Sequence, residues 1–140
     1  MRVLWFKMKK FSKKWKASKQ VRKQRKYRYN APLHIRRKFV SAHLSPELRE
    51  RFGKRSFPLR KGDEVKVMRG EFRGFKGVVE RVNLRDLKIY IEDLKVKKAD
   101  GSEVLKPLRS SNLMIVKLNL DDKKRLEALE RGTKTASVKE

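Results

Sequence analysis

The chain has 140 residues, enough for one compact domain with extra length but too few for two full domains. It contains 41 Lys and Arg against 16 Asp and Glu, a formal net charge of +25 with a pI near 10.8. A free globular protein of this charge repels itself, so we expect a polyanionic partner, nucleic acid first and an anionic membrane surface second. The absence of cysteine excludes disulfides, thiolate metal sites and thiol chemistry.

The positive charge is concentrated in the first part of the chain. Residues 1–61 contain 22 Lys and Arg and two acids, whereas residues 62–140 contain 19 basic and 14 acidic residues. The net charges of the two parts are therefore +20 and +5. A segment with so many like charges and so few apolar residues is not expected to stay compact in water unaided. We predict that residues 1–55 form a basic, partly helical N-terminal arm that becomes ordered on its partner.

The opening segment, MRVLWFKMKKF, is cationic and partly apolar, and its longest apolar run has four residues. A signal peptide needs about 7–15 apolar residues and a membrane span about 20, so we expect neither, and a cytosolic protein. Leu4, Met8, Phe11 and Trp15 recur at the spacing of one helix face, with lysines between them. A helix docked on RNA or protein, a disordered segment and an interfacial membrane helix are the alternatives here.

The stretch KQVRKQRKYRYNAPLHIRRKFVSAH interleaves cations with aromatic residues. Between residues 22 and 28, five cations lie beside Tyr27 and Tyr29. Basic side chains can neutralise phosphates, while Tyr and Arg planes can stack on unpaired bases. A solvated run of charge explains the cations poorly, because nothing acidic balances them, and it does not explain the tyrosines.

The segment SPELRERFG has the signals of a short helix with defined ends. Ser45 is a natural N-cap, Pro46 suits the first helical position, and Glu47 lies near the positive end of the helix dipole. Gly53 can close the helix in the left-handed conformation. The segment KRSFPLRKGD then leads into a second part with a different pattern.

From Asp63 onward the sequence predicts short strands with tight turns. Val79 and Val82 are three apart, so their strand needs a bulge or a sharp bend to aim both inward. Asp100-Gly101 between two runs predicts a type I′ hairpin. About five short strands in some 60 residues predict a small closed or nearly closed barrel over residues 56–118. The remaining strand residues are Val65 and Val67, Ile89 and Ile91, Leu94 and Val96, and Met114, Val116 and Leu118.

Residues 119–140 are predicted to form a short C-terminal helix and a flexible tail. In NLDDKKRLEALERG, Asn119 or Asp121 would cap the helix, acids lie early, and Gly132 would end it. The tail TKTASVKE has the composition of a disordered segment.

The segment VMRGEFRGFKGVVERVN carries three glycines among cations. A nucleotide-binding P-loop requires G-x-x-x-x-G-K-[ST] between a strand and a helix, whereas here the glycine spacings are four and three and a strand follows. We therefore predict a bent hairpin whose backbone needs positive φ at one or more places. Arg69, Arg73 and Lys76 would project from its tip toward a phosphate backbone.

No combination of residues in the sequence supports catalysis or metal binding. His34 and His43 are nine residues apart, with no cysteine or acid between them. Asp121-Asp122 at a helix start is typical of capping and dipole compensation. We expect no enzyme activity, no metal, no cofactor and no small-molecule substrate.

At RKGDEVKVMRGEFRGFKGVVERVNL the sequence closely resembles the KOW motif, a strand–loop–strand unit of ribosomal and transcription proteins. The flanking segments RKQRKYRYNAPLHIRRKFVSAHLSPELRERFGKRSFPLRKGD, VKKADGSEV and SNLMIVKLNLDDKKR resemble the archaeal and eukaryotic ribosomal protein family L twenty-four, called L twenty-six in eukaryotes. This resemblance covers about residues 19–126. It implies a mainly-β protein, an SH3-like barrel (the KOW domain), bound to large-subunit (23S-type) rRNA. It also implies early binding near the 5′ region of that RNA, beside the exit of the polypeptide tunnel and among neighbouring large-subunit proteins.

Carried over residue by residue, the RNA contacts of that family fall on residues 22–30, 34–38, 55–61 and 69–77. The expected function is a structural constituent of the cytoplasmic large ribosomal subunit that does not form homo-oligomers. The alternative is a KOW-type transcription elongation factor that binds nascent RNA and polymerase. Pattern and resemblance together assign RNA binding to Lys13, Lys14, Lys16, Lys19, Arg22, Lys23, Arg25, Lys26, Tyr27, Arg28, Tyr29, Asn30, His34, Arg36, Arg37, Lys38, Arg55, Arg60, Lys61, Arg69, Gly70, Arg73, Gly74 and Lys76.

Overall fold

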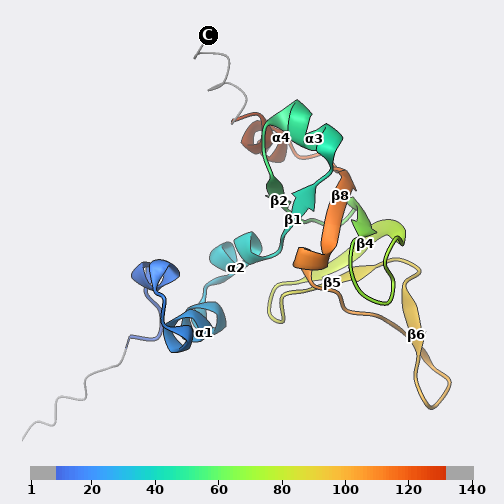
Figure 1. Ribbon diagram of the computed structural model, residues 1–140, viewed down its shortest axis with the longest axis horizontal. Helices are drawn as coiled ribbons and strands as arrows, with labels where there is room; N and C mark the ends of the chain where they lie inside the picture. Colours follow the sequence, from blue (N-terminus) through green and yellow to red (C-terminus); the bar gives the residue numbers. More distant parts are fainter. Residues whose placement is uncertain (1–8, 132–140) are drawn as a thin grey trace, which may run out of the picture.

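The computed structural model describes residues 9–131, which divide into a helical arm, residues 9–39, and a sheet-based body, residues 40–131 (Figure 1). The arm consists of η1 (Lys13–Ala17), α1 (Val21–Asn30) and α2 (Leu33–Phe39). Pro32 separates the two α-helices and occupies the N-cap position of α2. In Figure 1 the arm extends away from the sheet, with α2 the nearest of its elements to the body.

The arm has a small hydrophobic core of its own. Tyr27, Ala31 and Ile35 are buried. Phe11, Phe39 and the Trp15 ring of η1 pack against them. The Tyr27 ring stacks on Phe11 with centroids 5.1 Å apart and meets Phe39 edge-on at 5.7 Å. This apolar cluster was not predicted from the sequence, and the ordering of the arm on its partner stays a prediction. These side chains are dispersed among cations in the sequence and meet only when α1 and α2 fold back on each other.

The amphipathic helix expected around residues 4–15 is not continuous in the described part. Leu4 and Met8 lie outside the described residues. Phe11 precedes η1, and Trp15 lies within that short 3₁₀ turn. The Gln24 side chain donates to the carbonyl oxygen of Trp15 at 3.0 Å and to that of Ser18 at 2.7 Å. These hydrogen bonds fasten the turn to α1.

The body is built on one six-stranded sheet, in the order β2-β1-β8-β3-β4-β5. Its neighbouring strands pair antiparallel, except β1 and β8, which are parallel. The strands are β1 (Ser41–Leu44), β2 (Ser56–Pro58), β3 (Glu64–Val67), β4 (Lys76–Asn83), β5 (Lys88–Ile91) and β8 (Leu113–Lys117), the last preceded by η2 (Ser110–Asn112). The mainly-β fold is as predicted, but the sheet is open, so the expected closure of the barrel is not found.

Part of the predicted N-terminal extension, residues 40–52, contributes to the core of the body. β1 lies inside the sheet, and α3 (Pro46–Phe52) buries Phe52 in the core of the body. The ends of α3 are as predicted. Ser45 Oγ accepts a hydrogen bond from the Leu48 N–H, and Gly53 closes the helix at φ 62°.

The core residues predicted for β3, β4 and β5 are buried, except Val82, which is half-buried. Val65, Val79 and Ile89 are fully enclosed, and the pairing of β4 with β5 shifts register between Val79 and Arg81, where a bulge was expected. β8 exists, but the residues it buries are Leu113 and Ile115. Of the residues predicted for this strand, Met114 and Val116 are half-buried, and Leu118, just beyond β8, is buried. The run LMIV is apolar in both phases, so only pairing with β3 decides which phase is buried.

The hairpin at Asp100-Gly101 is present, but its turn differs from the predicted one. β6 (Lys95–Lys97) and β7 (Glu103–Leu105) form a separate two-stranded ribbon that projects from the body (Figure 1). A type I′ turn requires positive φ at both central residues, whereas only Gly101, at φ 88°, has it here. The Lys98 N–H donates to Ser102 O at 2.8 Å, which closes a three-residue loop with glycine at its last position.

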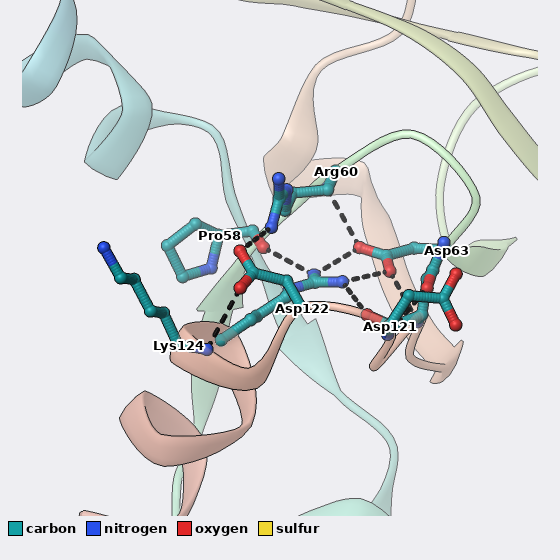
Figure 2. Close-up of polar contacts among 8 residues, drawn as sticks. Pro58, Arg60, Asp63, Asp121, Asp122 and Lys124 are labelled. Carbon is teal, nitrogen blue, oxygen red and sulfur yellow. Dashed lines mark hydrogen bonds and ion pairs between the residues drawn. The ribbon is translucent and has the colours of Figure 1, made fainter.

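A buried ion pair fixes the C-terminal helix α4 (Lys123–Glu130) to the body, as Figure 2 shows. Both carboxylate oxygens of Asp63 accept from the Arg125 guanidinium, at 2.7 and 2.6 Å. Arg125 also donates to the carbonyl oxygens of Asn119 and Pro58, at 2.6 and 3.1 Å. The backbone N–H groups of Arg60 and Asn119 donate to the same carboxylate, each at 2.9 Å. The pair thus joins two segments that are distant in sequence, residues 58–63 and 119–125.

The N-cap of α4 is Asp122, whose side chain accepts from the Lys124 N–H, and not Asn119 or Asp121 as expected. Asn119 Oδ1 instead accepts from the Asp121 N–H just before the helix. Gly132, the expected end of the helix, lies outside the described residues.

Replacement of Arg125 by glutamine should destabilise the body strongly. Asp63, whose side chain is fully buried, would be left without the guanidinium that accompanies it. We expect the free energy of unfolding to fall by about 3–5 kcal/mol, as is typical when one partner of a buried pair is removed. Urea unfolding of Arg125→Gln, followed by circular dichroism, measures this. Lys123→Gln, on the exposed side of α4, is the matched control and should change stability by less than about 0.5 kcal/mol; equal effects would contradict the assigned role.

Candidate nucleic-acid interface

The glycine loop, residues 68–75 between β3 and β4, is a tight turn that presents cations. Gly70 and Gly74 have φ of 99° and 90°, which confirms the predicted positive φ. The Gly74 N–H donates to Val67 O at 2.8 Å, and the Val67 N–H donates to Phe75 O at 2.9 Å. Phenylalanines of the loop pack partly against the core. The loop is therefore anchored from within and charged on its outer side. The predicted cations of the loop and of the first position of β4, all exposed, are Arg69, Arg73 and Lys76.

Gly77 has a different role from the two glycines of the loop. Its φ is not positive, and it pairs with Val65 inside the sheet. A Cβ at this position would lie 2.6 Å from Ile91 Cγ2 and 3.0 Å from Phe75 Cε1. Glycine is needed here for close packing of the loop on β5, whereas at Gly74 a Cβ would meet nothing within 4 Å and only the backbone conformation matters.

A double-mutant cycle separates these two roles. Gly77→Ala should destabilise the body by about 1–3 kcal/mol through overpacking. Combination with Ile91→Ala removes the clashing Cγ2, so we expect a favourable coupling energy of about 1 kcal/mol or more. Gly74→Ala combined with Ile91→Ala is the control, and its two effects should add within about 0.5 kcal/mol. Urea unfolding measures all five variants. Additivity at Gly77 would show that packing against Ile91 is not the reason for glycine.

Most of the arm cations that were predicted to bind RNA are exposed. Tyr29 is 78% exposed on α1 and is free to stack on a base. Tyr27 is not, because its ring is enclosed by Phe11 and Phe39, so its predicted role in base stacking does not fit the structure. The exposed arm residues of the predicted set, besides Tyr29, are Lys13, Lys14, Lys16, Lys19, Arg22, Lys23, Arg25, Arg28, His34, Arg37 and Lys38.

Arg36 was also predicted to contact RNA, but its guanidinium is occupied within the protein. It donates to Ala31 O at 2.9 Å and to Tyr29 O within the arm. From the same side chain, hydrogen bonds run to Arg85 O at 2.6 Å and Leu84 O at 3.4 Å in the turn between β4 and β5. Arg36 therefore joins the arm to the body.

Two further arm residues have mixed environments. The ammonium group of Lys26 lies 5.3 Å from the centre of the Trp15 ring, a cation–π contact that holds it near the small core of the arm. The Asn30 side chain donates to Lys26 O at 3.2 Å. Both are half-buried and contribute to the shape of the arm more than to its outer charge.

The arm and the body together form a cationic surface that the sequence did not single out. One hollow is lined by Arg25, Arg28 and Tyr29 of the arm together with Arg85 of the body. An adjoining hollow adds Arg109. The body arginines were missed because each is isolated in the sequence, outside the runs of basic residues. Their position beside α1 depends on tertiary packing, which periodicity and composition do not report.

The third predicted group, around the loop between β2 and β3, lies beside the start of α4. Arg55 and Lys61 are exposed. Arg60 forms an exposed ion pair with Asp122 at 2.8 Å (Figure 2). The hydrogen bond from Arg60, followed by that from the Lys124 N–H, lowers the pKa of the Asp122 carboxyl below its ordinary value. Asp122 therefore keeps its charge, and its capping role, to lower pH than a free aspartate.

Membrane spans and metal centres find no support in the described residues. None of the helices within residues 9–131 has the length and apolar composition to cross a bilayer. In the same part of the chain, no three His, Asp or Glu side chains are grouped so that they could hold a metal ion.

A comparison with known families decides the relationship of this chain. The model of one family, described as the ribosomal proteins L26 of eukaryotes and L24 of archaea, matches residues 18–132. The chain belongs to this family. The predicted resemblance is thus confirmed, and the match begins beyond the opening segment, for which the resemblance offered no counterpart. The family consists of structural ribosomal proteins, so the chain is not classed with enzymes.

Three relatives are similar in sequence to this chain over most of their own length. The chain is 52% identical over 115 residues to the large ribosomal subunit protein uL24 of Methanoculleus marisnigri, which covers 82% of this chain and 95% of that protein. It is 50% identical over 114 residues to uL24 of Methanocorpusculum labreanum, with 81% and 94% covered. Identity to uL24 of Methanosphaera stadtmanae is 48% over 114 residues, with 81% and 97% covered.

Proposed function

We propose that the protein is a structural constituent of the large ribosomal subunit that binds large-subunit rRNA through its arm and its glycine loop. Membership of a family of ribosomal proteins over residues 18–132 carries this proposal. The distribution of charge supports it, since exposed cations cover α1, α2 and the outer side of the glycine loop. The family comparison gives no support to the alternative of a transcription elongation factor.

The proposed mechanism is neutralisation of phosphates by a folded cationic surface. Arm and loop cations displace condensed counterions from the RNA, so affinity falls steeply with salt. Tyr29 adds stacking on an unpaired base, and shape rather than a code of base contacts gives selectivity. Binding also stabilises the small body, because the folded form binds better than the unfolded one.

The finer placement is also a proposal and is supported by the family relationship alone. The protein would bind early in assembly near the 5′ region of the large-subunit rRNA. It would then lie beside the exit of the polypeptide tunnel, next to other large-subunit proteins, in the cytoplasmic ribosome.

A salt titration with a 5′ fragment of archaeal large-subunit rRNA tests the proposal. If ten phosphates are neutralised, the logarithm of affinity should fall with the logarithm of salt concentration at a slope of about −7 to −9. Replacement of Arg22, Arg25 and Arg28 by glutamine should make the slope shallower by about 2 to 3. A slope near zero for the unaltered protein would contradict the proposal.

Two controls give the test its resolution. Replacement of Lys95, Lys97 and Lys98 on the projecting ribbon by glutamine removes the same charge from another place. If this variant loses as much slope as the arm variant, total charge and not the arm determines binding. Tyr29→Ala should lower affinity by about fivefold or more at an unchanged slope, because stacking is lost but no phosphate contact is.

A further inference from the structure

The arm and the body share a groove whose cations Arg37, Arg60 and Lys61 belong to the predicted RNA-binding set, whereas its apolar floor and Arg81 were assigned no role. It lies between α2, the loop that joins β2 to β3, and β4. Its floor is apolar and consists of Leu59, Val82 and Leu84, all of which pack on the core of the body. The groove encloses about 520 Å³, within the range of about 300–1,000 Å³ that is typical of small-ligand sites.

The rim of the groove carries four cations and one acid, and one of the cations, Arg60, is already paired with Asp122 at 2.8 Å. Arg81 is held in place by Tyr90, whose ring centre lies 4.4 Å from the guanidinium carbon. Within the part of the chain that the structure describes, no ion pair is formed by Arg37 or Lys61. The rim residues are Arg37, Arg60, Lys61, Arg81 and Glu80. An occupant must therefore supply negative charge at the rim and an apolar face at the floor.

We propose that this groove takes one unpaired nucleotide of RNA, with its base against the apolar floor and its phosphates at the cationic rim. The proposal rests on the RNA binding proposed above and names a site for it. A paired duplex offers phosphates without a free base face, so it would leave the floor uncovered. An unstacked nucleotide supplies both, since flipped bases pack against apolar side chains in pockets of this kind.

Arg36 gives the groove its shape. Its guanidinium donates to Leu84 O, at 3.4 Å, and to Arg85 O, at 2.6 Å. The next residue along α2 is Arg37, which forms part of the rim. The hydrogen bonds of Arg36 thus set the distance between a rim cation on the arm and a floor residue on the body. Docking of the arm therefore adds one wall, with Arg37, to a groove whose other lining residues belong to the body.

The test uses the full chain labelled with ¹⁵N and small probes of defined chemistry. Adenosine 5′-monophosphate and uridine 5′-monophosphate are titrated separately and followed by amide chemical shifts. Ribose 5-phosphate is the matched probe that lacks a base. We expect both nucleotides to shift the amides of residues 80–84 in a saturable manner, with affinities at least about tenfold above that of ribose 5-phosphate. Equal binding of all three probes, or no shift in residues 80–84, would overturn the proposal.

Two variants connect this site to RNA. Val82→Thr keeps the shape of the side chain and replaces one methyl group by a hydroxyl, so it should lower nucleotide affinity and leave ribose 5-phosphate binding unchanged. Arg81→Gln should weaken both probes and reduce the salt slope for the rRNA fragment by about 1. Lys97→Gln, away from the groove, is the control and should leave probe binding unchanged. If Val82→Thr does not fold, Leu84→Ala removes floor surface at a second position.

The outcomes separate this inference from the proposed function. If the rRNA fragment binds with the steep salt slope but Val82→Thr and Leu84→Ala bind nucleotides as well as the unaltered protein, the groove assignment alone is wrong. If nucleotides enter the groove but the rRNA fragment does not bind, the proposed function fails. An acidic peptide that shifts residues 80–84 where nucleotides do not would also overturn the assignment.

Discussion

The hydrogen bonds of one guanidinium hold the cationic arm against the body. Arg36 donates to carbonyl oxygens of Tyr29 and Ala31 on one side and of Leu84 and Arg85 on the other. The planar fork of arginine has five N–H donors, which makes this distribution possible from a single side chain, and a lysine ammonium would not reproduce it. Ser110 Oγ adds a longer hydrogen bond to Phe39 O, at 3.4 Å. The arm and the body, each with a hydrophobic core of its own, are thereby joined and present one common surface.

The consequence for function is that charge is presented in a fixed arrangement. If the arm were flexible, the arm cations and the glycine loop would contact RNA independently of each other. With the arm docked, the arginines of α1 lie beside those of the body, and Arg37 of α2 lies at the rim of the groove beside β4. The Asp63–Arg125 pair has the corresponding role at the other end, where it holds the loop that contains Arg60 against α4. A rigid surface loses less conformational entropy on binding RNA than an unfolded arm would.

Sequence reasoning succeeded where the cause is local. The ends of α3 follow from Ser45, Pro46 and Gly53, each of which acts within one helical turn. The glycine loop follows in the same way from the spacing of its glycines. Reasoning failed where distant segments decide the outcome. The buried face of β8 depends on pairing with β3, and the burial of Tyr27 depends on the return of α2. Arg36 cannot be told apart from its neighbour Arg37 in the sequence. Of the two, Arg36 is the one whose guanidinium donates hydrogen bonds within the described part of the protein.

The most direct measurement is amide hydrogen exchange of the free protein, without RNA, compared between the unaltered chain, Arg36→Gln and Arg37→Gln. A folded and docked arm predicts slow exchange for the helical amides of residues 25–30 and 36–39 in the unaltered chain. In Arg36→Gln this protection should fall by about tenfold or more, the equivalent of one charge-assisted hydrogen bond, while amides of β3 and β8 keep theirs. Arg37→Gln should leave the arm unchanged. Exchange of the arm amides at the rate of an unstructured peptide in the unaltered chain, or equal protection in all three proteins, would contradict the role assigned to Arg36.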